Sequence, residues 1–597
     1  MKTSRSGLAF LSLATATALL VPAPAGALPP AAPKTGMVCT PGTLAGTTRT
    51  FDLVANTGFI QTPDGNHLFM WSYAVDPVAD PTDLWPNFQS PGPVLCANEG
   101  ETVRVHLRNP GLPEATSIVF PGQDSAVTAT GGSPGLLTTE APVGGVVTYE
   151  FAASNPGTYL YESGSNISKQ VEMGLYGALV IRPSAGATFA YDASSTEFGS
   201  GLEFMLILAE IDPALHHAVE TGGTYDFTTL HNHYFTVNGR SFPDTLQDNG
   251  SDLLPTQPYG ALVRIPAHTP KPALIRMLNA GADNHPFHPH GNHTREIAQD
   301  GRLFLGPGGA RASTERFGET IGSGQTKDYL LSWDDVDGWA PSPPSKQLPV
   351  AQPNYRNLTF KDGTTWYSGS PYLGYKGTLP TGTVSLNVCG EWYFPLHSHA
   401  LNEFTNFDEP FGGMATLLRV DPQDGCFAFP TSTTIISGGG TANSGTFKNL
   451  GLDDALYYRV NSTTTGASRT TNWYGQFSGV PAGATSLKVT YKGRNCGTGT
   501  GTCPTTAAKP TTVFIWNWST SAWVQINPIP PTPPTSVGTT DVTFGPLNVP
   551  GSPSPTSWAN YVSKGTNRGR VRVRVSTTGS TNFVTGGNLM KLVYNAP

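Results

Sequence analysis

Short runs of valine, threonine and aromatic residues, each closed by glycine or proline, recur along almost the whole chain. The 597 residues include 68 glycines and 53 prolines, and only 13% are charged. Branched and aromatic side chains favour strands, while glycine and proline mark the turns between them. The pattern is typical of an all-β protein. Because the chain is too long for a single hydrophobic core, we expect about three domains.

The first 27 residues have the features of a secretory signal peptide. Lys2 and Arg5 give a positive start, an apolar stretch follows from Leu8 to Val21, and small residues at 25–27 fit a cleavage site. No later stretch reaches the length and apolar character of a membrane span. We therefore expect a secreted or extracytoplasmic protein whose mature chain begins at Leu28.

The strand-like runs divide the mature chain into three predicted domains. Residues 28–49 form an N-terminal arm, and residues 50–185 have the spacing of a β-sandwich. A second β-sandwich is predicted for 202–422, with a long inserted loop that is rich in proline. Beyond Pro422 the chain becomes rich in threonine, serine, glycine and asparagine and has no histidine. Residues 427–597 are predicted to form a third, jelly-roll-like β-sandwich.

Charge and cysteine content limit the partners and the compartment. The formal net charge is −7 and no basic stripe is present, so we do not expect binding to nucleic acid. Six cysteines suit disulfides in an exported chain. The predicted pairs are Cys39–Cys96, Cys389–Cys426 and Cys496–Cys503. Metal ligation by thiolate is the alternative, but no cysteine lies within the histidine-rich segments.

Two histidine-rich segments are the strongest functional signal. HPFHPHGNH occupies 285–293 and HSH occupies 397–399, and together they hold six of the 13 histidines. Residues two apart on a strand share a face, so paired imidazoles would point to one side. Clustered imidazoles suit copper or zinc. The candidate metal ligands are His288, His290, His397 and His399, together with His285.

With these segments in view, residues 50–422 resemble the multicopper oxidase family, which is built from cupredoxin sandwiches. TSIVFPG at 116–122 is similar to the family's TSIHWHG, and HPFHPHG is similar to HPxHLHG. GTYLYESGS and GLYGALVI within 157–181 are similar to GTYWYHSH and GLYGALII. WYFPLHSHALNEFTNFDEPFGGM at 392–414 is similar to W.YHCHI..H...GM. The resemblance implies two cupredoxin-like domains and a copper cofactor.

The family holds a type 1 copper with cysteine, two histidines and often methionine, and a trinuclear copper cluster with eight histidines. Carried over position by position, the first-domain histidines fall on residues that do not bind copper in this way: Val119, Pro121, Glu162 and Gly164. The type 1 cysteine falls on Ser398, and the histidine after it falls near Glu403. His285 and Met414 remain of the type 1 centre. Four trinuclear histidines remain, His288, His290, His397 and His399.

Since serine supplies no soft sulfur donor, we do not expect the four-copper oxidase reaction. The first hypothesis is a copper-binding oxidoreductase with a single-metal histidine site, an open position for a small molecule, and zinc as the alternative ion. The second is a non-enzymatic metal-binding or structural protein. In that hypothesis a carbohydrate-binding-like C-terminal domain attaches to a polysaccharide or cell surface. A histidine cluster without metal is the third reading.

Several further residues have two interpretations each. Glu162 and Glu172 are either oxygen ligands that replace lost histidines or ordinary carboxylates. Trp516, Trp518 and Trp523 are either a sugar-binding platform or part of a core. The histidines outside the candidate site are expected to be solvated or structural: His216, His217, His231, His233, His268 and His293. Two-domain relatives of the family form trimers, which leaves open whether this chain forms a homo-oligomer.

Overall fold

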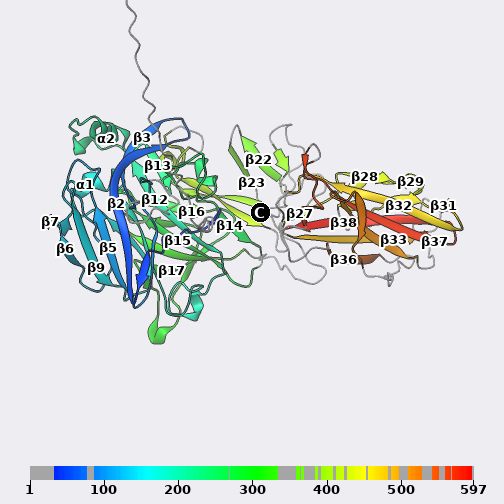
Figure 1. Cartoon of the computed structure of the whole chain (residues 1–597), viewed down its shortest axis with the longest axis horizontal. Coiled ribbons are helices and arrows are strands. Elements are labelled where there is room, and N and C mark those ends of the chain that lie inside the picture. The colour runs from blue at the N-terminus through cyan, green and yellow to red at the C-terminus, as the bar shows by residue number, and fades with distance from the viewer. Residues whose placement is uncertain are drawn as a thin grey trace, which may run out of the picture. The chain divides into compact units, whose positions relative to one another are not determined.

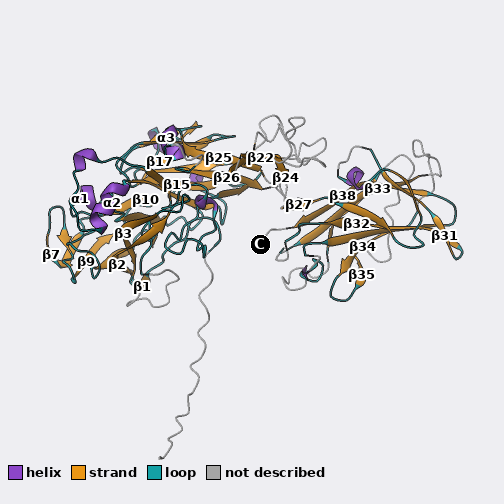
Figure 2. Cartoon of the chain, turned by 90° about the horizontal axis from the view of Figure 1, so that it is seen from above, coloured by secondary structure: helices purple, strands orange, loops and turns teal. Residues whose placement is uncertain are grey.

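The chain is folded mainly into β-strands, with a few short helices (Figures 1 and 2). This computed structural model describes residues 33–76, 87–267, 269–333, 358–362, 365–368, 384–386, 392–407, 412–421, 426–451, 455–481, 484, 486–496, 509–527, 541–549, 558–565 and 568–594. The predicted signal peptide and the start of the predicted arm lie outside these residues. The prediction of an all-β protein is confirmed.

The N-terminal sheets are built from residues between 43 and 182. The larger sheet contains β1 (Thr43–Ala45), β2 (Thr48–Gln61), β3 (His67–Val75), β5 (Thr102–Arg108), β6 (Thr128–Gly131) and β9 (Val146–Ala152). The smaller sheet contains β4 (Leu95–Asn98), β10 (Gly157–Glu162) and β11 (Tyr176–Arg182). A short pair, β7 (Ser133–Pro134) and β8 (Thr139–Glu140), and helix α1 (Ile167–Gln170) complete this part. β5 buries Val103, Val105 and Leu107 and turns the alternate residues outward, as the period of a strand requires.

Two further sheets are built from residues between 203 and 421. One contains β12 (Glu203–Ile211), β13 (Tyr234–Val237), β15 (Ala273–Asn279), β17 (Thr294–Gln299), β18 (Arg302–Leu303), β19 (Thr314–Arg316) and β21 (Thr326–Leu331). The other contains β14 (Val263–Pro266), β16 (His285–Pro289), β20 (Glu319–Ile321), β25 (Trp392–Ser398) and β26 (Ala415–Asp421). Helices α2 (Pro213–Glu220) and α3 (Leu401–Thr405) belong to this part, and β22 (Leu358–Asp362), β23 (Thr365–Ser368) and β24 (Val384–Leu386) form a small separate sheet.

Strand β12 is apolar on both faces because each face packs against a different core. Phe204, Leu206 and Leu208 join the core between the two sheets of the second part. Met205 and Ile207 join a cluster that also contains apolar residues of the N-terminal sheets. Residues 33–182 and 203–421 therefore share a buried interface.

The C-terminal sheets are built from residues between 426 and 594. One contains β27 (Cys426–Ala428), β29 (Thr441–Ser444), β30 (Tyr458–Asn461), β33 (Leu487–Cys496), β36 (Val542–Asn548) and β38 (Val584–Tyr594). The other contains β28 (Ser432–Ile435), β31 (Thr463–Thr465), β32 (Ser468–Phe477), β34 (Thr511–Asn517), β35 (Ala522–Gln525) and β37 (Val571–Gly579). Their shared core, which includes Trp473, Tyr491 and Val573, draws only on residues of this part.

One predicted disulfide is confirmed, since Cys39 bonds Cys96. Cys426 is also disulfide-bonded. The predicted partner Cys389 lies outside the described residues, as do the side chain of Cys496 and residue Cys503. Within the described ranges, no helix is long and apolar enough to cross a membrane.

Candidate metal centre

The two histidine-rich segments lie side by side as antiparallel strands. β16 pairs with β25 so that His288 lies directly opposite His397. The backbone N–H of His290 donates to the carbonyl of Pro395 at 2.8 Å, and that of His399 donates to the carbonyl of Pro286 at 2.7 Å. This register continues beyond the strand ends. It brings all four histidines to the same face, because residues two apart share a face and opposite residues do too.

The four rings form a compact cluster. The ring centroid of His288 lies 5.1 Å from that of His290, 4.7 Å from that of His397 and 4.9 Å from that of His399. Ring nitrogens of His288, His290 and His397 all lie within 4.8 Å of one another. Among the described residues, this is the one group of three or more histidines, cysteines or carboxylates so arranged. His399 lies beside the group, with its ring 6.1 Å from that of His397.

Burial and mutual repulsion keep the imidazoles of His288, His290 and His397 neutral. Burial, followed by the neighbouring His290 and His399, lowers the pKa of His288 from 6.5 to about 4. The pKa of His397 is also lowered to about 4, mainly by burial. Burial and His399 lower the pKa of His290. A neutral imidazole is the form that binds a metal, so near neutral pH no proton competes strongly for these sites.

The local contacts of His397 fix which of its nitrogens faces the cluster. Nδ1 lies 2.6 Å from the carbonyl oxygen of Ser398, so Nδ1 carries the proton and donates it there. The lone pair of Nε2 then points at His290, whose Nε2 lies 3.0 Å away. Phe404 of α3 stacks on the His397 ring with centroids 4.2 Å apart. One edge and one face of the imidazole are therefore held in place.

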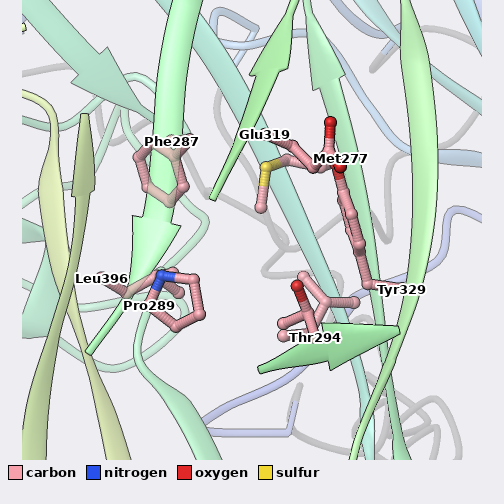
Figure 3. A pocket seen from close by; sticks show the side chains of 8 residues that line it. Met277, Phe287, Pro289, Thr294, Glu319, Tyr329 and Leu396 are labelled. Atoms are coloured by element: carbon pink, nitrogen blue, oxygen red, sulfur yellow. The ribbon is translucent and has the colours of Figure 1, made fainter. Parts of the chain in front are cut away.

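His285 lies on the opposite face of β16 from His288 and His290. His285 shares a face of the strand with Phe287 and Pro289, because alternate residues point to the same side. That face is turned to the interior. Figure 3 shows Phe287, Pro289 and Leu396 around a small cavity between the sheets, with Met277, Glu319 and Tyr329 on its other side. The same alternation turns Ser398 inward beside His285, because Ser398 and Leu396 are two apart on β25.

The interior position where the sequence resemblance places a type 1 copper holds a hydrogen-bonded network in this chain. His285 Nδ1 lies 3.0 Å from Glu403 Oε2, and His285 Nε2 lies 3.1 Å from Glu210 Oε2. The Ser398 hydroxyl donates to the same Glu403 oxygen. Burial alone would lower the pKa of His285, but the bonds to Glu210 and Glu403 outweigh it and raise the pKa to about 9. His285 is therefore an imidazolium between two carboxylates.

Glu210 is the functional residue that sequence reasoning missed. It is the next-to-last residue of the apolar run FMLILAEI and is 2% exposed. Its carboxylate also accepts the backbone N–H groups of Ala282 and Asp283. The single acid of the run at 204–211 was the available signal, since such a group is rarely buried without partners. Met414, the other predicted remnant of the type 1 centre, is fully buried in the core.

The four first-domain positions contain no imidazole. Val119 and Glu162 form an isolated antiparallel bridge, and a Cβ on Gly164 would meet Val119 at 2.7 Å. Burial raises the pKa of Glu162 to about 7. Glu172 is also buried, its pKa is raised to about 8 by burial and by Glu210, and it accepts the N–H of Asp212. Neither carboxylate belongs to the three-histidine group described above.

The remaining histidines have ordinary surroundings, apart from His268, which lies outside the described residues. His216 is buried and bonds the backbone carbonyls of Phe69 and Glu172. His217 is exposed beside Glu220, and His293 is exposed near Phe317. The rings of His231 and His233 pack against Phe407. These contacts agree with the expected structural and solvated roles.

Comparison with known proteins gives one family and several relatives. Residues 79–186 match the family model described as multicopper oxidase. Over 298 residues the chain is 26% identical to a putative laccase-11 of Oryza sativa subsp. japonica, covering 48% of each protein. Over 103 residues it is 41% identical to copper resistance protein A of Pseudomonas syringae pv. tomato, covering 17% of this chain and 16% of that protein. The match thus spans about half, or less, of the length of these curated relatives.

Among solved structures, the blue copper oxidase from Nitrosomonas europaea is similar with a TM-score of 0.41 and 19% identity. That similarity covers 62% of this chain and 86% of the other.

Proposed function

Because this chain is a member of the multicopper oxidase family, we propose that it is an exported copper-binding oxidoreductase with a single-metal histidine site. The observation that carries the proposal is the convergence of neutral ring nitrogens from His288, His290 and His397 within 4.8 Å. Three imidazoles suffice to hold copper or zinc. Copper is the ion that the family implies, and zinc is the alternative.

The donor set fits one ion. Nitrogens that share an ion at about 2.0–2.1 Å lie up to roughly 4.2 Å apart, so small ring rotations would bring all three into range. The His290–His397 contact of 3.0 Å needs a proton on one of its two nitrogens, and an ion bound between them would replace that proton. Copper held there would supply a one-electron redox centre.

The protein residues have distinct roles in this proposal. His397 is buried and held by Ser398 and Phe404, so it anchors the ion. His290 and His399 are exposed, which leaves the solvent side open to a small molecule. His399 is the fourth candidate ligand, and His285 contributes less because both of its nitrogens are already hydrogen-bonded to carboxylates.

The type 1 position argues for one copper site instead of four coppers. Ser398 and Glu403 are joined there by a hydrogen bond, and neither is a soft donor. The first-domain positions 119, 121, 162 and 164 have no imidazole to complete a trinuclear cluster. The substrate or redox partner, the exported location and the whole-protein activity belong to the proposal.

Copper titration of the full chain, purified without a metal-affinity tag, tests the proposal. We expect about one copper per chain and a higher thermal midpoint with copper, since an ion that binds only the folded state stabilises it. The double variant His290→Ala/His397→Ala should lose the bound copper and the copper-dependent shift. Its midpoint without copper should be lower, because the buried ring of His397 is lost, and it should not rise when copper is added.

The matched control is His67→Ala/His217→Ala, which removes two exposed imidazoles outside the cluster. It should bind copper as the parent protein does. An unchanged copper stoichiometry in the His290/His397 variant would show that the cluster is a relic without a metal. It would favour the non-enzymatic reading of the chain.

A further inference from the structure

The outer face of one C-terminal sheet has an unusual layer of aromatic residues. In the sheet of β28, β32, β37, β34 and β35, one set of alternating residues is buried and the other faces outward. Figure 2 labels β32, β34 and β35 in this part. The outward set includes Tyr474, Phe514, Trp516 and Trp523, all partly exposed, and Trp518 follows just beyond β34. The tryptophans predicted as either platform or core thus lie at the surface.

The aromatic rings contact one another along this face. Trp516 meets Trp518 edge to face at 6.4 Å and Trp523 at 5.0 Å between centroids. Trp523 in turn lies 5.7 Å from Tyr474. The contacts run across β32, β34 and β35, so the rings form one surface and not separate side chains.

Two arginines from β37 are part of the same layer. The Arg572 guanidinium lies 5.2 Å from the Tyr474 ring and 4.8 Å from that of Trp518. The Arg574 guanidinium lies 3.8 Å from the Phe514 ring and 4.9 Å from that of Trp523. The surface therefore alternates apolar rings with planar cations.

Neither guanidinium has an acidic partner among the described residues. Arg572 donates to Gln476 at 3.0 Å, and the buried Nε of Arg574 has no hydrogen-bond partner. The outward residues of these strands within the described ranges are otherwise neutral, such as Thr434, Asn472 and Gln525. An unpartnered, partly buried guanidinium is costly, and a ligand anion would relieve that cost.

The opposite sheet of the same sandwich shows the usual arrangement. Arg494 stacks over Tyr457 at 4.2 Å, and its Nε also donates to Asp541 at 2.7 Å. The stacked arginine there is neutralised by a carboxylate from the protein itself. Within the part of the chain that the structure describes, the face with Arg572 and Arg574 has no such carboxylate, so its charge can pair with that of a ligand.

We propose that this face binds an acidic polysaccharide, with the sugar rings against Trp516 and Trp523 and the uronate carboxylates at Arg572 and Arg574. The apolar face of a pyranose ring packs on an aromatic ring, and a guanidinium pairs with a carboxylate through two parallel hydrogen bonds. The proposal is independent of the copper site. A single-stranded nucleic acid would also stack on aromatic rings, but its dense phosphates need a basic groove. This face has two cations in a chain of net charge −7.

Affinity electrophoresis of the full chain tests the proposal with three probes: polygalacturonate, neutral galactan and oligothymidylate. We expect polygalacturonate to bind at least about tenfold more tightly than the other two at low salt, and to weaken as salt rises. Arg572→Gln/Arg574→Gln should weaken polygalacturonate binding at least about tenfold. Trp516→Ala should weaken it as well.

Lys488→Gln is the matched control, because it removes one exposed cation from the opposite sheet. It should leave the binding unchanged. Arg572→Lys/Arg574→Lys tests whether the glutamine variant loses binding through misfolding. Because the lysine variant keeps both positive charges, it should still bind polygalacturonate, more weakly and in a salt-sensitive way. Three results would overturn the proposal: no binding of polygalacturonate, equal binding of galactan, or full binding by the glutamine variant. Tighter binding of oligothymidylate would show that this face binds a nucleic acid and not a polysaccharide.

Discussion

The buried network around His285 occupies the position where the resemblance to multicopper oxidases places a type 1 copper. His285 lies between Glu210 and Glu403, and the Glu403 carboxylate also accepts the hydroxyl of Ser398. A protonated imidazole thereby supplies the positive charge that balances buried carboxylates. With a carboxylate at Glu403 and a hydroxyl at Ser398, the groups around His285 form hydrogen bonds and ion pairs.

Restoring the thiolate alone should therefore not restore a blue copper site. In Ser398→Cys, Glu403 still occupies the position of the second histidine and still bonds His285. We expect no intense blue absorption after copper is added, because the remaining donors are hard oxygens and an engaged imidazole. The absorption spectrum of the copper-loaded variant is the measurement. A strong blue band would mean that copper displaces the hydrogen bonds of the network and binds the new thiolate.

The same network predicts a fall in stability at alkaline pH. The pKa of His285 is about 9 in the folded protein and about 6.5 as an ordinary histidine. Its stabilising effect is complete below about pH 6.5 and is lost as the pH rises through 9. Glu403→Gln should lower the free energy of unfolding at pH 6 by about 3 kcal/mol and flatten its decline towards pH 9. Urea denaturation at the two pH values measures both effects.

Glu150→Gln is the control for this prediction, since Glu150 pairs with Arg104 at the surface, where the two side chains are 40% and 38% exposed. It should change the free energy by less than about 1 kcal/mol at either pH. If the free energy of unfolding fell with pH in the same way for the parent protein and for Glu403→Gln, His285 would not be an imidazolium.

At the scale of the element, strand parity decides which histidines act together. β16 and β25 turn His288, His290, His397 and His399 to one face and turn His285 and Ser398 to the other. The sequence predicts this division, because spacing sets the face of each histidine pair and the family resemblance places the two strands side by side. The sequence was not enough to predict Glu210, which comes from β12 of the facing sheet, or the fully buried position of Met414. Both depend on which strands pack together across the sandwich.

Helix α3 connects the two faces, since it carries Glu403 of the network and Phe404, which stacks on His397. The close approach of Gly413 fixes its position: a Cβ there would lie 1.9 Å from the carbonyl oxygen of Glu403. We expect Gly413→Ala to cost about 1–3 kcal/mol of stability and to weaken copper binding. Thermal unfolding and copper titration measure the two effects.

Gly306→Ala is the matched control, because its added Cβ would meet nothing closer than 3.5 Å. It should change stability by less than about 0.5 kcal/mol. Equal stability of the two variants would show that α3 can shift without a cost in the free energy of unfolding.

At the scale of the whole molecule, the C-terminal part has a core of its own. Among the described residues, that core runs from Cys426 to Tyr594 and contains no residue from 33–421. The change in composition after Pro422 predicted this boundary, which stays a prediction until the parts are separated. The sequence did not reveal the outward position of Trp516 and Trp523, because alternation alone does not tell which face of a strand is buried.

We therefore expect residues 427–597 to fold as an isolated fragment. Its thermal unfolding should be cooperative and should match a separate transition of the full chain. A fragment that unfolds gradually would place the boundary elsewhere or make the fold depend on the rest of the molecule.

The proposed function requires one copper site built from His288, His290 and His397, with no type 1 centre. The most direct test is the copper content of the untagged full chain, measured by elemental analysis together with its paramagnetic resonance spectrum. We expect about one copper per chain, with nitrogen ligands and without the small copper hyperfine splitting of a thiolate-bound centre. Four coppers per chain, or a thiolate-type signal, would contradict the proposed function.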